Sequence, residues 1–316
     1  MRAIGVDLGG SHVLAAVVED GVIKSRAEND IDDRTFEVVT KTVIATIRAV
    51  ADAEKENLPI GVGSPGNVDL ATGLVRYSPN LGWHDAPFGA KLRDHLERPV
   101  FVANDARCAT LGEHTYGGGR GTANFVLLTL GTGIGGGIVA EGTLLIGNAA
   151  GAGEIGHHQV RATDGFYCNC GKIGCFEAQA SGTGLLRHAL AVAPSFPRSQ
   201  LLAEKPGKLG SKAIRRAAES GDQHALAAWN RYVDDLARGL ANIIAFLNPE
   251  VIALGGGVSS AGDFMLRFVR PKVDELTTMV PRGQTRIVIA ELGNDAGAIG
   301  AAVMAHRGGL SATENR

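Results

Sequence analysis

The chain lacks a large excess of charge of either sign, because its 31 lysine and arginine residues nearly balance 33 aspartate and glutamate residues, for a formal net charge of −2. This balance gives no general basic signature for nucleic acid or an anionic membrane. A membrane-length apolar run is also missing, since runs such as 124-NFVLLTL-130 have only the length of a strand. The first residues lead directly into 3-AIGVDLGG-10, without the basic region and apolar stretch of a secretory leader. We therefore expect a cytoplasmic protein without nucleic-acid or membrane partners, in which thiols stay reduced.

The sequence contains no GxxxxGK[ST] phosphate loop, although it has 44 glycines among its 316 residues. These glycines cluster beside apolar runs, which indicates close backbone approach to a ligand. A predicted strand at 3–8 meets Gly9-Gly10-Ser11, and a second apolar run follows where a phosphate loop would begin a helix. The glycines are therefore predicted to form the tip of a β-hairpin.

The same order recurs after the glycine-rich stretch 117–121, which we expect to be flexible. A predicted strand at 124–130 meets Gly131-Thr132-Gly133, and apolar residues continue to 141. A single glycine hairpin is equally well explained as a plain structural turn. Two in corresponding positions indicate duplicated domains whose hairpin N–H groups bind phosphates. Asp7, just before the first turn, is then placed to hold Mg²⁺ through water, or alternatively to accept turn N–H groups.

Strands and helices are both predicted along the chain. The C-terminal half is mostly helical from 180 to 246, interrupted by a loop at 194–211. The other expected elements are strands at 12–19, 22–28, 58–66, 99–104, 134–141, 143–147, 250–256 and 286–292, helices at 36–55, 88–96, 105–115, between the last two strands and at 295–307, and a loop at 78–85.

Asn104-Asp105 lies where a predicted strand ends and a helix begins. Asparagine and aspartate are preferred helix caps, so a capping role explains the pair as well as a catalytic one. A carboxylate beside a helix N-terminus is also favoured in its ionised form and could accept a proton from a hydroxyl group.

Three of the four cysteines lie in 168-CNCGKIGCFE-177. The spacing differs from the CxxC…CxxC pattern of a zinc ribbon, and three thiolates need a fourth ligand to close a tetrahedral site. His157 and His158 are within loop reach. Unrelated reduced thiols and a regulatory disulfide remain as alternatives, whereas Cys108 is expected to be a packed thiol.

These motifs, in this order, resemble those of the ROK sugar kinases, with the bacterial glucokinases as the nearest subgroup. The resemblance spans residues 5 to about 300 and rests on 7-DLGGS-11, 104-ND-105, 130-LGTGIGGG-137, 154-EIGH-157, 168-CNCGKIGCFE-177 and 254-LGGG-257. It implies an actin/hexokinase-like (ribonuclease H-like) duplicated two-domain α/β fold, with ATP and sugar in the interdomain cleft. We expect a smaller domain of residues 1–116 plus about 298–316, and a larger one of 117–297 that carries a zinc-binding loop.

The resemblance also implies roles for individual residues. Asp105 would be the base that takes the proton from the sugar 6-hydroxyl group, and Asn104 would bind neighbouring hydroxyls. Other sugar contacts would come from Glu154, His157 and Glu177, with Asn80 and Gly66 of the Ser64-Pro65-Gly66 turn as further candidates. ATP with Mg²⁺ would contact Asp7, Gly9, Gly10, Ser11, Gly131, Thr132, Gly133, Gly255, Gly256 and Gly257. A structural Zn²⁺ would be held by His157, Cys168, Cys170 and Cys175.

The expected activity is an ATP-dependent hexose 6-kinase acting on glucose. Alternatives within the family are N-acetylmannosamine, N-acetylglucosamine or fructose as substrate, polyphosphate as donor, and a sugar-responsive repressor. A repressor needs an N-terminal helix-turn-helix, whereas this sequence has two residues before its first strand. The family also implies a homodimer or a dimer of dimers. His12 stands where the family often has lysine, and Arg107 is a second departure that we expect on the helix surface.

Overall fold

The computed structural model describes residues 1–203 and 209–310 of an α/β chain that divides into two compact units. Unit 1 comprises Met1–Thr122, Gly137–Gly153 and the residues from Glu291 onward, and unit 2 comprises Ala123–Gly136 and Glu154–Ala290. Part of the predicted loop 194–211 therefore lies outside the described residues. Among the described helices, none is long and apolar enough to cross a membrane.

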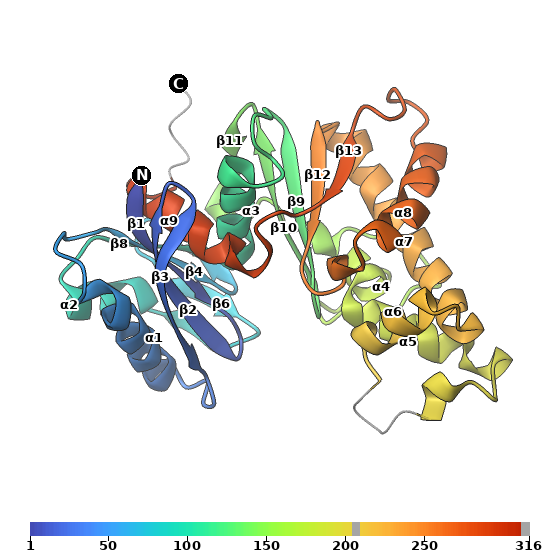
Figure 1. Cartoon of the computed structure of the whole chain (residues 1–316), viewed down its shortest axis with the longest axis horizontal. Coiled ribbons are helices and arrows are strands. Elements are labelled where there is room, and N and C mark those ends of the chain that lie inside the picture. Colours follow the sequence, from blue (N-terminus) through green and yellow to red (C-terminus); the bar gives the residue numbers. More distant parts are fainter. Residues whose placement is uncertain (204–208, 311–316) are drawn as a thin grey trace. The chain divides into compact units, whose positions relative to one another are not determined.

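Unit 1 contains the elements from both ends of the chain, and in Figure 1 the C-terminal helix α9 runs beside the N-terminal strand β1. Its elements are β1 (Arg2–Leu8), β2 (His12–Glu19), β3 (Val22–Asp30), α1 (Phe36–Ala51), β4 (Ile60–Ser64), β5 (Asn67–Val68), β6 (Val75–Ser78), β7 (Trp83–Ala86), α2 (Phe88–Leu96), β8 (Val100–Asn104), α3 (Asp105–Tyr116), β11 (Thr143–Leu144) and α9 (Ala296–His306).

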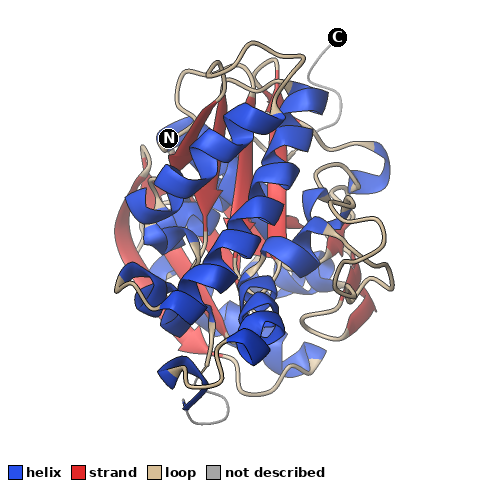
Figure 2. Cartoon of the chain, turned by 90° about the vertical axis from the view of Figure 1, so that its right-hand side faces the viewer, coloured by secondary structure: helices blue, strands red, loops and turns tan. Residues whose placement is uncertain are grey.

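Unit 2 is richer in helix, and Figure 2 shows its helices in front of the strands. Its elements are β9 (Phe125–Leu130), α4 (Phe176–Ala180), α5 (Gly182–Val192), α6 (Ser211–Glu219), α7 (Gln223–Leu247), β12 (Val251–Gly255), α8 (Asp263–Leu276) and β13 (Arg286–Ile289). Strand β10 (Ile134–Ala140) begins in unit 2 and ends in unit 1.

Two sheets have the same strand order, β3-β2-β1-β4-β8 in one and β11-β10-β9-β12-β13 in the other. In the first, β1 is antiparallel to β2 and parallel to β4, which is parallel to β8. In the second, β10 is antiparallel to β11, while β12 is parallel to both β9 and β13. This correspondence confirms the internal repeat that the two glycine turns predict.

Strand β1 is buried on both faces, as expected for a strand inside a sheet covered by helices. Ile4, Val6 and Leu8 pack in one hydrophobic cluster with the apolar stripe of α1. Helix α9 packs very closely on the other face of β1. A Cβ atom on Gly5 would lie 1.8 Å from the carbonyl oxygen of Ala298. A glycine is therefore required where α9 crosses β1.

Helix α4, which follows the cysteine cluster, is seated in unit 2 by close packing on α7. Phe176 is fully buried, and a Cβ atom on Gly239 would lie 2.2 Å from its ring. The missing side chain at Gly239 makes room for the aromatic ring. The orientation of α4, and hence of the residues on it, is fixed by this contact.

Three local predictions need correction. Helix α1 ends at Ala51 and not at 55, because the buried stripe of this helix ends at Ala51. The predicted loop 78–85 contains the start of β7, where Trp83 is buried and meets the ring of Phe36 edge-on at 5.1 Å.

The third correction concerns the stretch 117–121, which we expected to be flexible. It is folded against Glu113, a fully buried residue whose carboxylate accepts the Gly118 N–H at 2.9 Å. The carbonyl oxygen of Glu113 accepts the N–H groups of Gly117 and Gly119. The same carboxylate also accepts the N–H groups of Glu291 and Leu292, so one side chain fixes two chain segments.

Candidate active site and metal centre

Asn104 and Asp105 occupy the junction between β8 and α3 in unit 1. Asn104 is the N-cap of α3, since its side-chain oxygen accepts the Arg107 N–H at 3.2 Å. Its amide nitrogen donates to the carbonyl oxygen of Gly66 at 3.0 Å. The capping role expected of this pair is thus confirmed for Asn104, and it leaves Asp105 as the first residue of the helix.

Asp105 lies close enough to Asp7 for the two carboxylates to repel each other. The pKa of Asp7 is raised to about 7, first by burial and then by the charge of Asp105. The Asp7 carboxylate sits against the first turn of α9, where a Cβ atom on Gly297 would lie 2.5 Å from it. Two carboxylates at the carboxyl ends of β1 and β8 are suited to share a cation or to divide proton-accepting and cation-binding tasks.

Gly66 lies beside this junction, whereas Asn80 is further along the chain in an exposed turn. Gly66 has φ +103°, and a Cβ atom there would lie 2.2 Å from the Tyr77 carbonyl oxygen. Only glycine fits this position, where its carbonyl group receives Asn104. Asn80 lies in the turn between β6 and β7, and its backbone carbonyl accepts a 3.3 Å hydrogen bond from Arg34.

Arg107 is buried, with 3% of its surface exposed, so the expectation of a helix-surface residue is wrong. Its Nη2 donates to the carbonyl oxygens of Ala150 and Ala152, at 2.5 and 2.6 Å. One signal of this was present in the sequence, since Arg107 departs from the family motif that Asn104, Asp105 and Ala106 follow. Its partners, more than 40 residues away, could not be foreseen.

The first glycine turn is a tight hairpin tip, as predicted. The Gly9 N–H donates to the His12 carbonyl at 2.9 Å, while Gly10 has open space around it. Ser11 and His12 are exposed. The imidazole of His12 packs beside Gly9.

The second glycine turn is a hairpin tip in unit 2 that is joined to the start of α5. The Gly131 N–H donates to the Gly133 carbonyl at 3.0 Å, and the Gly182 N–H donates to the Gly131 carbonyl at 2.7 Å. The Thr183 hydroxyl donates to the Thr132 carbonyl at 2.8 Å. Sequence reasoning did not assign these α5 residues to the site.

The glycine turn after β12 meets this hairpin from the neighbouring strand. Gly256 has φ +84°, and a Cβ atom there would lie 2.7 Å from the Leu130 carbonyl oxygen. The Val258 N–H donates to the same carbonyl at 3.0 Å. Unit 2 thus brings together the glycine segments 131–133 and 255–257, which the sequence places 122 or more positions apart.

The three clustered cysteines and His157 form a candidate metal centre in unit 2. Their ligand atoms all lie within 4.8 Å of one another. The Cys170–Cys175 Sγ distance is 3.6 Å, and Cys168 Sγ lies 3.7 Å from His157 Nδ1. A tetrahedral zinc site with bonds of about 2.3 Å to sulfur and about 2.0 Å to nitrogen has ligand–ligand separations of about 3.5–3.8 Å. The donor set therefore fits zinc, and the sulfur separation does not fit a disulfide.

Burial, together with the neighbouring thiols, raises the pKa of Cys175 to about 12. A buried thiol of this kind becomes a thiolate at neutral pH only beside a cation. His158, the other histidine within reach, faces away from the thiols. Its Nδ1 lies 2.6 Å from the Ile155 carbonyl oxygen, and its ring packs on Phe176.

Glu177 links the metal centre to the second glycine hairpin. Its Oε2 accepts the Ile134 N–H at 2.9 Å, and its Oε1 lies 3.7 Å from Cys168 Sγ. This half-buried carboxylate is therefore not a solvated surface charge. Glu154 is exposed, and its carbonyl group accepts the His157 N–H in the short 3₁₀ helix that presents the histidine.

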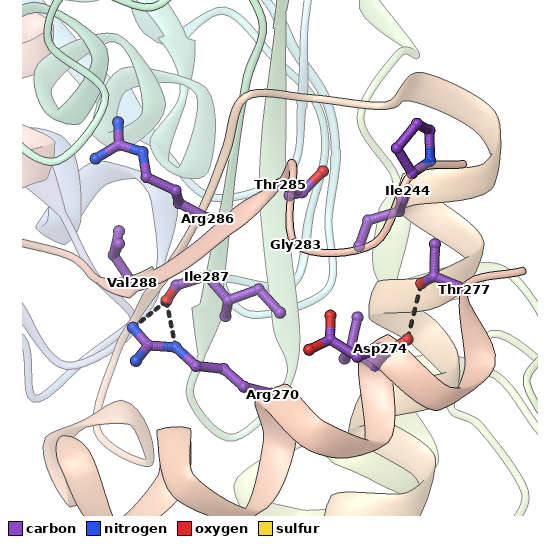
Figure 3. A pocket seen from close by; sticks show the side chains of 11 residues that line it. Ile244, Arg270, Asp274, Thr277, Gly283, Thr285, Arg286, Ile287 and Val288 are labelled. Carbon is purple, nitrogen blue, oxygen red and sulfur yellow. Dashed lines mark hydrogen bonds between the residues drawn. The ribbon is translucent and has the colours of Figure 1, made fainter.

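A separate pocket of about 260 Å³ lies in unit 2 between α8 and β13 (Figure 3). Arg270 donates from both Nε and Nη2 to the Ile287 carbonyl oxygen there, and Asp274 lies across from it. The residues that line this pocket include none of the predicted site residues.

A duplicated α/β chain with paired glycine hairpins and a carboxylate at a strand–helix junction has the actin/hexokinase-like fold. Residues 3–308 match the family model described as the ROK family, and the chain belongs to this family. It is 40% identical over 307 residues to a glucokinase of Thermotoga maritima, covering 96% of each chain. It is 31% identical to an N-acetylmannosamine kinase of Haemophilus influenzae, covering 96% of this chain and 94% of the relative.

A solved structure supports the same assignment. The crystal structure of a ROK family glucokinase from Streptomyces griseus in complex with glucose and AMPPNP superposes with a TM-score of 0.84. The two chains are 32% identical, and the match covers 97% of this chain and 100% of the other.

Proposed function

We propose that the protein is an ATP-dependent hexokinase that transfers the γ-phosphate of ATP to the 6-hydroxyl group of glucose. The observation that carries the proposal is the placement of Asp105 at the start of α3, close enough to Asp7 to help raise the pKa of the Asp7 carboxyl group. The similarity to glucokinases over nearly the whole chain supports glucose as the substrate.

Asp105 is the group that accepts the proton of the attacking hydroxyl. Its Oδ1 accepts the Ala106 N–H at 2.8 Å, which orients the carboxylate at the helix N-terminus. The side chain of Asn104 is held by its hydrogen bonds with the Gly66 carbonyl group and the Arg107 N–H. The hydrogen-bonding groups that remain on its amide therefore point in nearly fixed directions. Oriented groups of this kind position the nucleophile, which is the main contribution of a protein to phosphoryl transfer.

The two glycine hairpins would bind the phosphates of ATP through backbone N–H groups. In the first hairpin these would be the N–H groups of Gly10 and Ser11, since the Gly9 N–H closes the turn by donating to the His12 carbonyl group. Unit 2 would contribute the segments 131–133 and 255–257. Mg²⁺, which accompanies ATP in kinases, offsets phosphate charge, and Asp7 would hold its hydration shell.

We propose that the hexose hydroxyl groups are bound by Asn104, Glu154, His157 and Glu177, with Gly66 and Asn80 as further contacts. Ionised carboxylates and amides form strong directional hydrogen bonds with such hydroxyls. Zinc held by His157, Cys168, Cys170 and Cys175 has four protein ligands, so its role would be structural. It would fix the loop from which His157 and Glu177 act.

Two other assignments are tested by the same assays. In the first, the substrate is another hexose or an N-acetylhexosamine in place of glucose, as the similarity to an N-acetylmannosamine kinase suggests. A sugar-responsive regulator would bind sugar without turnover. The proposal also includes a cytoplasmic location, supported by cysteines that are free thiols throughout the described part of the chain, and a homodimer or dimer of dimers.

The test is an assay over a panel of hexoses, in which turnover is followed by ADP release with ATP as donor and by formation of the hexose 6-phosphate with polyphosphate as donor, since polyphosphate releases no ADP. Asp105→Asn is expected to retain the fold and sugar binding but to lose about 10³-fold in kcat, as removal of a general base does. Asp263→Asn is the matched control, because Asp263 is also a carboxylate in the first turn of a helix. A near-normal rate for Asp105→Asn would remove this residue from the mechanism, and no turnover of any hexose would overturn the kinase assignment.

A further inference from the structure

Arg107 connects the first turn of α3 to the loop 147–153 of unit 1. Its backbone N–H is bound by the side chain of Asn104, and its guanidinium Nη2 donates to two carbonyl groups of the loop. One side chain therefore joins the helix that begins with Asp105 to the segment that ends one residue before Glu154.

The loop has a backbone conformation that needs such support. Ala149 and Ala150 have φ values of +49° and +54°, in the left-handed region that residues with a Cβ atom rarely adopt. Conformations of this kind persist only where their surroundings hold them. Here the carbonyl groups of Ala150 and Ala152 accept from Arg107, and the Ala149 carbonyl lies 3.4 Å from the amide nitrogen of Asn67.

Two of the side chains that hold the loop, those of Asn67 and Arg107, lie within two residues of a proposed sugar contact, and Arg76 Nη1 adds a contact of 3.5 Å to the Ala149 carbonyl oxygen. Asn67 follows Gly66, whose carbonyl group accepts Asn104. Arg107 lies two residues after Asp105. The loop, the Gly66 turn and the start of α3 thus form one hydrogen-bonded assembly with Arg107 buried among them.

We infer that Arg107 is a positioning residue for the hexose. It holds the left-handed turn at Ala149–Ala150 and thereby sets where the chain enters the segment of Glu154. The expected effect of Arg107 on hexose kinetics rests on the proposed function. Its role in holding the loop 147–153 does not depend on that function.

Lysine cannot replace this arginine. The Nη2 atom carries two hydrogens in the fixed plane of the guanidinium group, one for each carbonyl oxygen. A lysine side chain keeps the positive charge and carries three N–H donors, but it is one bond shorter, so its ammonium nitrogen stops short of the position from which Nη2 reaches both carbonyl groups.

The test compares Arg107→Lys with Arg93→Lys. Arg93 is a matched control, since it also donates to two backbone carbonyl groups of unit 1, those of Thr72 and Val100, outside the loop. Arg107→Lys is expected to lower kcat/KM for glucose by roughly 10- to 100-fold, the size of effect that a small misplacement produces. The loss should lie mainly in the glucose KM, with the ATP KM unchanged. Arg93→Lys should keep both constants.

Hydrogen–deuterium exchange of the 147–153 amides provides the readout that does not depend on activity. Faster exchange there in Arg107→Lys, but not in Arg93→Lys, is expected. Arg107→Gln, which keeps two amide hydrogens on a shorter chain, should behave like Arg107→Lys. An unchanged glucose KM with unchanged exchange would overturn the inference. If the wild-type protein phosphorylates no hexose, the proposed function fails, and exchange alone decides the role of Arg107.

Discussion

The Glu177 carboxylate accepts a hydrogen bond from the backbone N–H of Ile134 at 2.9 Å. This bond joins the helix after the cysteine cluster to the tip of the second glycine hairpin. The same carboxylate lies against Gly133, where a Cβ atom would be 2.4 Å from its Oε2. The turn that we propose binds phosphate and the carboxylate that we propose binds sugar are therefore mutually constrained within unit 2.

Gly133→Ala should consequently displace Glu177 without unfolding the protein, because the atom in the way is the end of a flexible side chain. We expect the hexose KM to rise tenfold or more, since a hydrogen bond to a charged group contributes about 1.5–3 kcal/mol. The free energy of unfolding should fall by about 1.5–3 kcal/mol, because the displaced carboxylate loses its hydrogen bond from the Ile134 N–H. Steady-state kinetics and urea denaturation measure the two effects. Gly210→Ala, at a glycine with no atom within 4 Å of its added Cβ, is the control.

The raised pKa of Asp7 predicts how stability depends on pH. Because the pKa is about 7 in the folded protein and 3.8 in the unfolded chain, the folded state binds more protons between these values. The free energy of unfolding should therefore fall as pH rises from about 4 to 7, by about 1.4 kcal/mol for each pH unit at most. Asp7→Asn should remove this component. Denaturation at pH 5 and pH 8 checks it, and an identical pH dependence in both proteins would contradict it.

Cys170→Ser should lower zinc content, stability and hexose affinity together, because the proposed zinc would fix the loop that carries the proposed sugar contacts. Zinc is measured by elemental analysis, stability by thermal unfolding and affinity by the hexose KM. Cys108→Ser is the control for zinc content, since Cys108 lies in α3 outside the cluster. Loss of zinc with an unchanged hexose KM would show that the metal does not support the sugar site.

A buried ion pair anchors the cysteine-bearing loop independently of the metal. Asp235, fully buried in α7, lies 2.7 Å from Arg161 Nε and 3.2 Å from His188 Nε2. Asp235→Ala should reduce the free energy of unfolding by about 1.5–3 kcal/mol, because it removes a buried charged hydrogen-bond partner and leaves Arg161 paired only with the exposed Asp164. Asp234→Ala removes the exposed pair with Lys272 and should cost only ~0–1 kcal/mol. Equal effects in urea denaturation would show that Arg161 finds another partner.

Much of the site could be predicted because its signals are local. The glycine turns, the Asn104-Asp105 junction and the spacing of the cysteines each lie within about ten residues. Backbone preferences and the stereochemistry of metal ligands act at that range. The repeated strand order also followed from local patterns, since each copy consists of a strand, a glycine turn and a second strand.

The errors came from contacts between distant segments. Trp83 forms a strand because it packs on Phe36, although the residues around it carry turn signals. Arg107 has a sequence environment typical of a helix surface, yet it is buried because its partners arrive from 43 and 45 positions away.

The α/β repeat, the candidate metal ligands and the residue that begins α3 could be predicted from the sequence alone, because each depends on neighbouring residues and on ligand chemistry. Only the tertiary structure decided that Glu177 binds the Ile134 N–H, that Arg107 holds the loop before Glu154, and that Asp105 raises the pKa of Asp7. Burial, hydrogen bonds to carbonyl groups and charge repulsion act here between groups that are far apart in the sequence and become close only in the fold. Local sequence patterns do not show which distant groups will meet.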